Sequence, residues 1–153
     1  MTYLSAPGDH AAEIQALSDG WVKAMGVRFV KATADEVIAE VVIGPQHRQP
    51  LGIVHGGVYA GLVETVTSIG AALNSAKYGC HVVGLENHSS FLRAAREGKL
   101  TATAVPLVTG KRSQVWEATI RDEQGRTAAT GRVRLLVLEA DAQLAGEGAA
   151  LKP

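Results

Sequence analysis

One apolar segment, GIVHGGVYAGLVETVTSIGA at residues 52–71, constrains the fold of this 153-residue chain more than any other feature. From about Gly57 to Lys77, apolar side chains occupy a wide arc of the helical wheel, which is typical of a helix buried inside a protein. Gly79 follows and suits a helix C-terminus. We therefore expect one long core helix, against which the rest of the chain must pack.

Strand-like runs stand on both sides of this helix in the sequence. Two precede it and are joined by Ala34-Asp35, which suits a hairpin turn; four follow it, and DEQG at 122–125 suits a tight turn between the last two. The expected strands cover residues 27–33, 36–43, 81–93, 99–109, 112–121 and 126–138. Because one helix covers only one face of a sheet, we expect an α+β fold in which a curved antiparallel sheet wraps around the helix. The outer face of that sheet then meets solvent or another subunit.

The chain length fits a single domain with one core. We expect this domain to span residues 1–153, with its core between about residues 20 and 138. A short helix is expected near residues 9–19. Both termini, and in particular the Ala- and Gly-rich tail at 140–153, are expected to be mobile.

Composition narrows the classes of partner. Lys and Arg together number 15, as do Asp and Glu, so the net charge is zero. This balance argues against a nucleic-acid-binding protein, because phosphate neutralisation requires an excess of positive charge. Cys80 is the only cysteine, which suits a reducing compartment. The N-terminus has no secretory signal pattern and no run of about 18 apolar residues occurs, so we expect a cytoplasmic protein that does not span a membrane.

The start of the long helix is unusual. The first N–H groups of a helix lack intrahelical partners, and Ser, Thr, Asp or Asn normally caps one of them. Here Val54, His55 and Gly56 stand at this position, so we expect no good side-chain cap. Free N–H groups and the positive end of the helix dipole favour a carbonyl oxygen that gains negative charge, and glycine lets such a group approach. A tight bend at Gly56-Gly57 is the structural alternative.

Glu64 is the only carboxylate within the long apolar helix. An ionised carboxylate in apolar surroundings must be paired, hydrogen-bonded or functional. Ser68, four residues later, lies on the same helical face and can donate a hydrogen bond, and Thr67 is a second candidate. A helix edge in contact with water is the simpler alternative.

The spacing of Gly56 and Glu64 limits how they can cooperate. They lie eight residues apart, which corresponds to about 12 Å along a helix. One small carbonyl group cannot contact both within a single chain. If the two positions act together, a second copy of the helix must lie antiparallel to the first, and a working site requires at least a homodimer with two equivalent sites.

The stretch HGGVYAGLVETVTS, residues 55–68, resembles the core motif of hotdog-fold acyl-CoA thioesterases. The similarity is greatest to the group that includes the Arthrobacter-type 4-hydroxybenzoyl-CoA thioesterase and the PaaI-like enzymes. It extends over about residues 20–138 and includes HRQPLGIVHGG, ENHSSFLR and SQVWEATIRDEQGR. The resemblance implies a hotdog fold, hydrolysis of an aryl- or medium-chain acyl-CoA to free acid and CoA, and subunits that pair side by side, often into a homotetramer.

The resemblance also implies roles for five residues in the long helix and in the loop before it. Glu64 matches the catalytic carboxylate, acting as nucleophile or as general base for water. Gly56 matches the residue whose N–H, from the partner subunit, polarises the thioester carbonyl. Gln49 matches a side chain that orients the thioester and the water. Ser68 would position water or the carboxylate, and His55 would lie near the thioester sulfur or support the loop.

The CoA moiety of such a substrate should meet cations. Arg93 matches an arginine that contacts a nucleotide phosphate, and Lys111 and Arg112 are further candidates, because charge-assisted hydrogen bonds suit phosphate. His88 and Ser89 lie on a strand whose end could reach the acyl pocket. A solvated surface charge is the alternative for each cation, and a structural histidine is the alternative for His88.

Two other functions remain open at the level of sequence. One is a hotdog hydroxyacyl dehydratase or hydratase, although Pro50 stands where that family has its catalytic histidine. The other is a non-catalytic acyl-CoA-binding protein, although there is no room for a fused DNA-binding segment before residue 20. Serine-hydrolase, zinc, Walker and Rossmann motifs are absent from the sequence, so we expect no metal and no cofactor.

Overall fold

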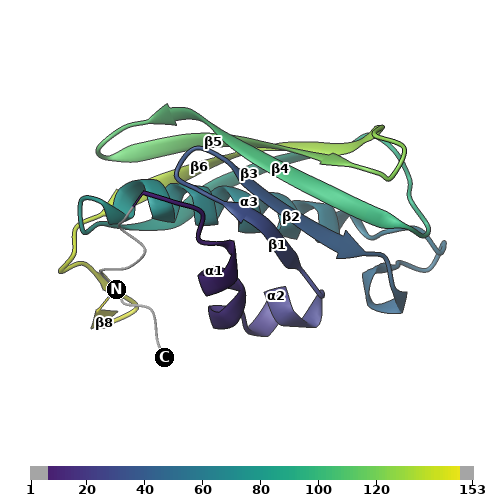
Figure 1. Cartoon of the computed structure of the whole chain (residues 1–153), viewed down its shortest axis with the longest axis horizontal. Helices are drawn as coiled ribbons and strands as arrows, with labels where there is room; N and C mark the ends of the chain where they lie inside the picture. The colour runs from purple at the N-terminus through teal and green to yellow at the C-terminus, as the bar shows by residue number, and fades with distance from the viewer. Residues whose placement is uncertain (1–6, 149–153) are drawn as a thin grey trace.

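The structure is a computed structural model that describes residues 7–148. A six-stranded antiparallel sheet packs against one long helix, with two short helices beside them (Figure 1). The helices are α1 (Ala11–Leu17), α2 (Gly20–Ala24), η2 (Pro45–His47, a 3-10 turn) and α3 (Gly56–Ala76), and the sheet strands are β1 (Arg28–Ala32), β2 (Val37–Val42), β3 (His81–Phe91), β4 (Lys99–Thr109), β5 (Ser113–Arg121) and β6 (Thr127–Leu138). The expected α+β fold is confirmed, and α3 and the six strands lie within two residues of their expected bounds. Within the described part of the chain, no helix has the length and apolar character needed to cross a bilayer.

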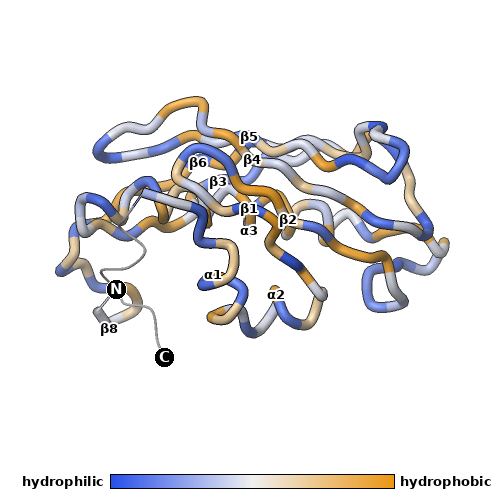
Figure 2. The backbone as a smooth tube through the Cα atoms, in the orientation of Figure 1, coloured by the Kyte–Doolittle hydropathy of each residue, from blue (hydrophilic) through white to orange (hydrophobic). Residues whose placement is uncertain are grey.

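The order of strands in the sheet is β1-β2-β4-β5-β6-β3, and every neighbouring pair is antiparallel. Alternate side chains of the strands are buried, as in β2, where Val37, Ala39 and Val41 are almost fully inaccessible. These inward rows meet α3, which packs on β2, β3, β4, β5 and β6. Figure 2 shows hydrophobic residues along β1, β2 and parts of α3, whereas the residues at the hairpin ends are largely hydrophilic. The core therefore lies between α3 and the inner face of the sheet.

A glycine in α3 allows close packing on β5. An added Cβ at Gly70 would lie 2.4 Å from Cζ3 of the Trp116 ring. Trp116 is fully buried, and its Nε1–H donates to Gln114 Oε1 at 2.8 Å. Gln114 Nε2 donates in turn to Ser75 Oγ at 2.7 Å. This buried chain of hydrogen bonds fixes the second half of α3 on the sheet, since an unpaired polar group there would be costly.

The N-terminal helix differs from its expected bounds, whereas the mobility of the termini stays a prediction. The N-terminal helix stops early, because Ser18 takes up extended backbone and bonds through Oγ to the Ile14 carbonyl at 2.7 Å, and α2 then begins at Gly20. The C-terminal tail, expected to be mobile, contains a small hairpin of β7 (Gln143–Leu144) and β8 (Glu147–Gly148). Residues 1–6 and 149–153, which belong to the termini expected to be mobile, lie outside the described residues.

Candidate active site

The N-terminus of α3 is capped, which corrects the expectation from the sequence. His55 is the N-cap residue, and its Nδ1 accepts a hydrogen bond from Gly57 N–H at 2.8 Å, because an imidazole nitrogen can accept as a capping oxygen does. Val58 N–H donates to the His55 carbonyl at 2.9 Å. Gly56 N–H has no acceptor among the described residues. The cap thus leaves one free N–H at the positive end of the helix dipole, where a developing oxyanion would be stabilised.

A buried histidine holds the loop that precedes α3. His47 is 1% exposed; its Nδ1 accepts from Gly44 N–H at 2.8 Å, and its Nε2 lies 2.9 Å from the Met25 carbonyl oxygen. The His47 carbonyl accepts from His55 N–H at 2.8 Å. Hydrogen bonds therefore connect the loop both to the end of α2 and to the start of α3. No sequence pattern around His47 predicts this role, because its partners Met25 and Gly44 lie outside any recognisable motif.

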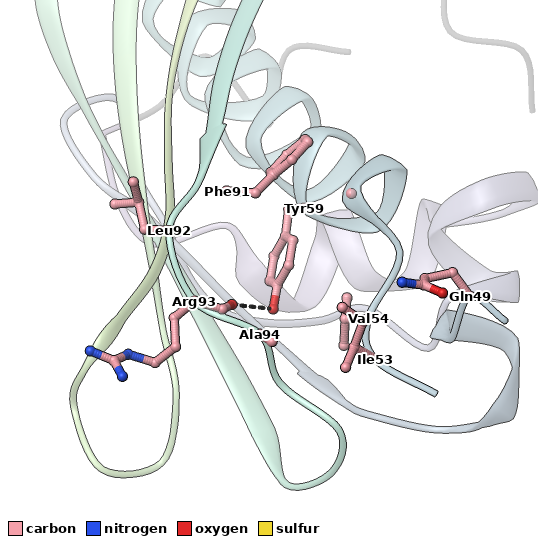
Figure 3. A pocket seen from close by; sticks show the side chains of 9 residues that line it. Gln49, Ile53, Val54, Tyr59, Phe91, Leu92, Arg93 and Ala94 are labelled. Carbon is pink, nitrogen blue, oxygen red and sulfur yellow. Dashed lines mark hydrogen bonds between the residues drawn. The ribbon is translucent and has the colours of Figure 1, made fainter. Parts of the chain in front are cut away.

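Gln49 lies in a tight turn of the same loop. Its N–H donates to the Ile53 carbonyl at 2.9 Å, its carbonyl accepts from Gly52 N–H at 2.8 Å, and its Oε1 accepts from Leu51 N–H. Gly52 has a φ of 75°, which glycine adopts readily. The turn places Gln49 next to the N-terminal end of α3, and its role in orienting the thioester stays a prediction (Figure 3).

A pocket of about 290 Å³ opens at this end of α3 (Figure 3). Within it the Tyr59 and Phe91 rings stack with centroids 5.9 Å apart, and Tyr59 OH donates to the Arg93 carbonyl at 3.4 Å. Burial, and after it the charge of Asp122, raises the pKa of the Tyr59 phenol, which therefore remains a neutral donor. An added Cβ at Gly56 would lie 2.6 Å from the Phe91 ring, so a larger residue would displace the ring. The lining residues are Gln49, Ile53, Val54, Gly56, Tyr59, Phe91, Leu92, Arg93 and Ala94.

Glu64 lies half-buried on the part of α3 that meets β3. Ser68 Oγ donates to Glu64 Oε1 at 3.3 Å, in agreement with the predicted pairing. Asn87 Nδ2, on β3, donates to Glu64 Oε2 at 2.9 Å and to the Ala60 carbonyl at 3.1 Å. Ser89 Oγ donates to Asn87 Oδ1 at 2.7 Å. Two donors thus hold the carboxylate, and a third group orients one of them.

A β-bulge in β3 sets which of its side chains reach α3. Leu85 is the extra residue, since Gly84 and Glu86 pair with consecutive residues of β6. Gly84 faces α3, where an added Cβ would lie 2.4 Å from Glu64 Oε1. Without the bulge, strict alternation from Gly84 would put Glu86 and His88 on this face as well.

Because of the bulge, Asn87 and Ser89 face α3 and His88 faces away from it. His88 pairs with Arg132, which is exposed on the outer face of the sheet. The structure therefore places His88 on the opposite face of β3 from Glu64, and His88 does not reach the carboxylate within this chain. Ser89 lies on the inner face, as a partner of Asn87.

The predicted catalytic residues form two groups along the chain. Gln49, His55 and Gly56 lie at the N-terminus of α3, whereas Glu64 and Ser68 lie further along the same helix. Continuous helix separates Gly56 from Glu64, which corresponds to about 12 Å. One chain therefore presents two half-sites, and a single small carbonyl group cannot contact both.

The three candidate phosphate-binding cations are exposed, and one chain does not bring them together. Arg93 N–H donates to the Ala128 carbonyl near the start of β6, and the Arg93 guanidinium extends away from the stacked rings (Figure 3). Lys111 and Arg112 form the β4–β5 turn, where the Arg112 carbonyl accepts from Val137 N–H near the end of β6. The two groups therefore lie at opposite ends of the sheet.

Two further residues near Glu64 were not singled out from the sequence. Asn87 stands within ENHSSFLR, but only the bulge reveals which face it occupies. Trp21, on α2, fills the space left by Gly61, where an added Cβ would lie 2.3 Å from ring carbon Cζ2. The absence of a side chain at Gly61 thus lets α2 approach α3 closely. Across residues 7–148, no cluster of three or more His, Cys, Asp or Glu side chains could hold a metal ion.

Comparison with known proteins adds to this geometry. Residues 51–129 match the family model described as the thioesterase superfamily. The chain is 40% identical over 118 residues to the protein Rv1847 of Mycobacterium tuberculosis, covering 76% of this chain and 84% of that protein. It is 35% identical over 117 residues to the proofreading thioesterase EntH of Cronobacter turicensis, covering 76% of this chain and 85% of EntH. The solved structure of thioesterase HI1161 of Haemophilus influenzae is similar with a TM-score of 0.76 and 34% identity, over 82% of this chain and 87% of that one.

Proposed function

The chain belongs to the thioesterase superfamily and is a thioester hydrolase with the hotdog fold, and from this premise we propose that it hydrolyses acyl-CoA thioesters at sites shared by two subunits. The resemblance found in residues 55–68 is thereby confirmed for the family and the class of reaction. The observation that carries the proposal is that α3 presents two functional groups at separate positions along one helix. Gly56 offers a free N–H at the helix start, and Glu64 offers a carboxylate held by two donors.

The edge strand β3 is the surface through which we infer that two chains pair. It has 11 residues, bonds to β6 on one side only, and leaves Leu85 53% and Phe91 54% exposed. An exposed edge of this kind carries unpaired N–H and C=O groups that a second strand can satisfy. Antiparallel pairing of β3 with its copy sets the two α3 helices antiparallel, so that Gly56 of one chain approaches Glu64 of the other.

In this arrangement, each side of the thioester meets a different chain. Gly56 N–H donates to the thioester carbonyl oxygen, and Gln49 of the same chain orients the ester. Glu64 of the other chain provides the attacking oxygen, either its own carboxylate oxygen or that of a water it deprotonates, while Ser68 holds the carboxylate. The negative charge that develops on the carbonyl oxygen is stabilised by the Gly56 N–H and the helix dipole.

Collapse of the tetrahedral intermediate breaks the C–S bond and releases the CoA thiolate. This step needs little protonation, because the ordinary pKa of a thiol is about 8.5. If Glu64 attacks directly, water then hydrolyses the acyl anhydride formed on Glu64. Single turnover in water labelled with a heavy oxygen isotope tests direct attack, because water that attacks the Glu64 carbonyl of the anhydride leaves its label in Glu64.

The same pairing accounts for the distribution of cations. Arg93 and the turn of Lys111 and Arg112 lie at opposite ends of one sheet, so antiparallel pairing brings the Arg93 end of one chain to the Lys111–Arg112 end of the other. Guanidinium and ammonium groups from both chains then serve the CoA phosphates. The outer face of the sheet, with exposed Val105 and Leu136, is where two such dimers would form the expected homotetramer.

Release of free thiol from acyl-CoA esters tests this function. We expect Glu64→Gln to lower kcat by at least about 100-fold, the lower range for a residue in acid–base catalysis. A near-normal kcat would remove Glu64 from the mechanism. Calorimetric binding of acyl-CoA without thiol release would instead indicate a binding protein, and hydration of crotonyl-CoA would indicate a hydratase.

A further inference from the structure

A second cavity, which we name the α1–α3 cavity, lies between the short N-terminal helices and the second half of α3. Its volume is about 530 Å³, within the range of sites that hold small ligands. Apolar side chains from α1, α2, α3 and β3 dominate its lining, among them Leu17, Val22, Ile69, Ala72 and Val82. The proposed mechanism does not use this cavity.

Few polar groups of the cavity lining could recognise a polar ligand. Ser18 Oγ already donates to the Ile14 carbonyl at 2.7 Å. The Asp19 side chain is 87% exposed and lies 3.8 Å from Lys23 Nζ, so this carboxylate is turned to solvent. Cys80 and His81 complete the polar part of the lining. A lining of this composition favours a hydrocarbon chain over a charged or strongly polar ligand.

The cavity continues the seam between α3 and β3 on which Glu64 lies. The Glu64 carboxylate rests against Gly84 of β3. α3 and β3 run in opposite directions. From the contact of Glu64 with Gly84, the seam therefore passes the later residues of α3 and the earlier residues of β3. Both paths enter the cavity, at Ile69 and Ala72 on α3 and at Val82 on β3. Figure 1 shows α1 and α2 on the side of α3 away from β4 and β5. Ile14 and Leu17 of α1 and Val22 of α2 line the cavity on that side.

The length of the cavity favours some acyl groups over others. It extends along α3 from Ile69 to Ala76, which corresponds to about 10 Å. Its far part is bounded by the small residues Ala72, Ala76 and Gly79, so the space there remains open. An aromatic acyl group whose carbonyl lies at Glu64 ends before that part, whereas an extended medium-length aliphatic chain reaches past Ile69 toward Ala72, which is about 12 Å along α3 from Glu64.

We propose that the α1–α3 cavity binds the acyl chain, and that the preferred substrates are medium-chain aliphatic acyl-CoA thioesters rather than short-chain or aromatic ones. This inference rests on the proposed function. Each methylene that enters an apolar cavity gains the free energy of leaving water. The specificity of the enzyme should therefore rise with chain length until the cavity is full.

Steady-state thiol release from acetyl-, butanoyl-, hexanoyl-, octanoyl-, decanoyl- and benzoyl-CoA tests the proposal on the unmodified protein. We expect kcat/KM to rise about fourfold per added methylene up to a plateau. Benzoyl-CoA should fall below octanoyl-CoA. A profile that is flat with chain length, or a preference for benzoyl-CoA, overturns the assignment of the cavity. Absence of thiol release from every ester overturns the proposed function instead.

Variants that fill the cavity with a larger side chain test the proposal independently. Ala72→Phe should lower the ratio of octanoyl to acetyl kcat/KM by about 100-fold, because several methylenes lose their site. Ala76→Phe, deeper in the cavity, should reduce the ratio of decanoyl to hexanoyl kcat/KM more strongly than the ratio of hexanoyl to acetyl. Ala140→Phe, at an exposed position outside the cavity, should keep the wild-type profile. An unchanged octanoyl-to-acetyl ratio in folded Ala72→Phe, with native circular dichroism, contradicts the proposal.

Discussion

Asn87 acts on Glu64 from a neighbouring strand. Its Nδ2 holds Glu64 Oε2 at 2.9 Å, while Ser89 fixes its own Oδ1 at 2.7 Å. A carboxylate with a single donor at Ser68 could rotate about its terminal torsion, which is soft. The second donor restricts that rotation and so determines which oxygen lone pairs are free to attack or to accept a proton. Asn87 is therefore a positioning residue.

Removal of this donor should lower kcat more than it changes KM. We expect Asn87→Ala to reduce kcat about tenfold, since a hydrogen bond to a charged group contributes roughly 1.5 kcal/mol. Asn87→Asp should instead move the acidic limb of the kcat profile to higher pH, because a second carboxylate raises the pKa of the pair. Ser90→Ala, on the outer face of β3, is the matched control. If Asn87→Asp leaves the pH profile unchanged, Asn87 has only a structural role.

Single residues could be predicted where spacing along one helix decides the contact. Ser68 follows Glu64 by one turn, and the hydrogen bond between them is present. Contacts that depend on a second element were missed or misplaced. Alternation along ENHSSFLR gave no means of locating the bulge at Leu85, so Asn87 was not among the candidates, and the structure places it on the inner face with Ser89.

At the scale of elements, α3 and β5 depend on the absence of a side chain at Gly70. An added Cβ there would lie 2.4 Å from the fully buried Trp116 ring, which has no free space to move into. We expect Gly70→Ala to lower the free energy of unfolding by about 2 kcal/mol, as overpacked cores do. Gly148→Ala, where an added Cβ meets nothing within 4 Å, should leave it nearly unchanged. Urea denaturation of both variants measures this, and equal midpoints would contradict the packing account.

An ion-pair network links β1, β2 and β4 through Glu40. Lys99 Nζ lies 2.7 Å from Glu40 Oε1, and Arg28 pairs with the other carboxylate oxygen. The hydrogen bond from Lys99 lowers the pKa of Glu40, burial opposes this, and Arg28 adds to the lowering. A carboxyl whose pKa is lower in the folded state stabilises the fold at pH above its unfolded pKa. That contribution is lost as pH falls through the folded-state pKa.

The pH dependence of Tm therefore tests the network. Near neutral pH, Glu40→Gln should lower the free energy of unfolding by roughly 1 kcal/mol, because the three side chains are partly exposed. The difference from wild type should start to shrink below the ordinary Glu pKa of 4.5 and disappear at lower pH. A difference that stays constant through this range would show that Glu40 acts by packing rather than by charge.

The elements themselves were well predicted because their signals are periodic and local. Helical and strand periodicities predicted the bounds of α3 and of the six strands to within two residues. The prediction that α3 has no side-chain cap was wrong. It relied on the N-cap preferences for Ser, Thr, Asp and Asn, which do not include the imidazole that His55 supplies. The break between α1 and α2 was also missed, because it depends on the backbone conformation of Ser18 rather than on periodicity.

For the whole molecule, the separation of Gly56 and Glu64 was predictable and decisive. Helix rise alone placed them about 12 Å apart, and α3 is continuous between them. The order of strands was not predictable, because the pairing of β3 with β6 joins segments with two other strands between them. That pairing makes β3 an edge and leaves its outer side open to a second chain. Sequence thus predicted that a site using both residues needs two chains, and β3 is the edge at which we propose that they meet.

Complementation between two inactive variants tests the shared site most directly. Glu64→Gln and Gln49→Ala are each produced alone, and are then co-expressed with different affinity tags so that mixed dimers can be purified. In a mixed dimer, one site receives Glu64 from one chain and Gln49 with Gly56 from the other, and the second site carries both substitutions. We expect co-expression to restore about a quarter of the wild-type thioesterase activity, because half of the dimers are mixed and each has one intact site. Activity no higher than that of the separate variants, in purified mixed dimers, would contradict a site built by two subunits.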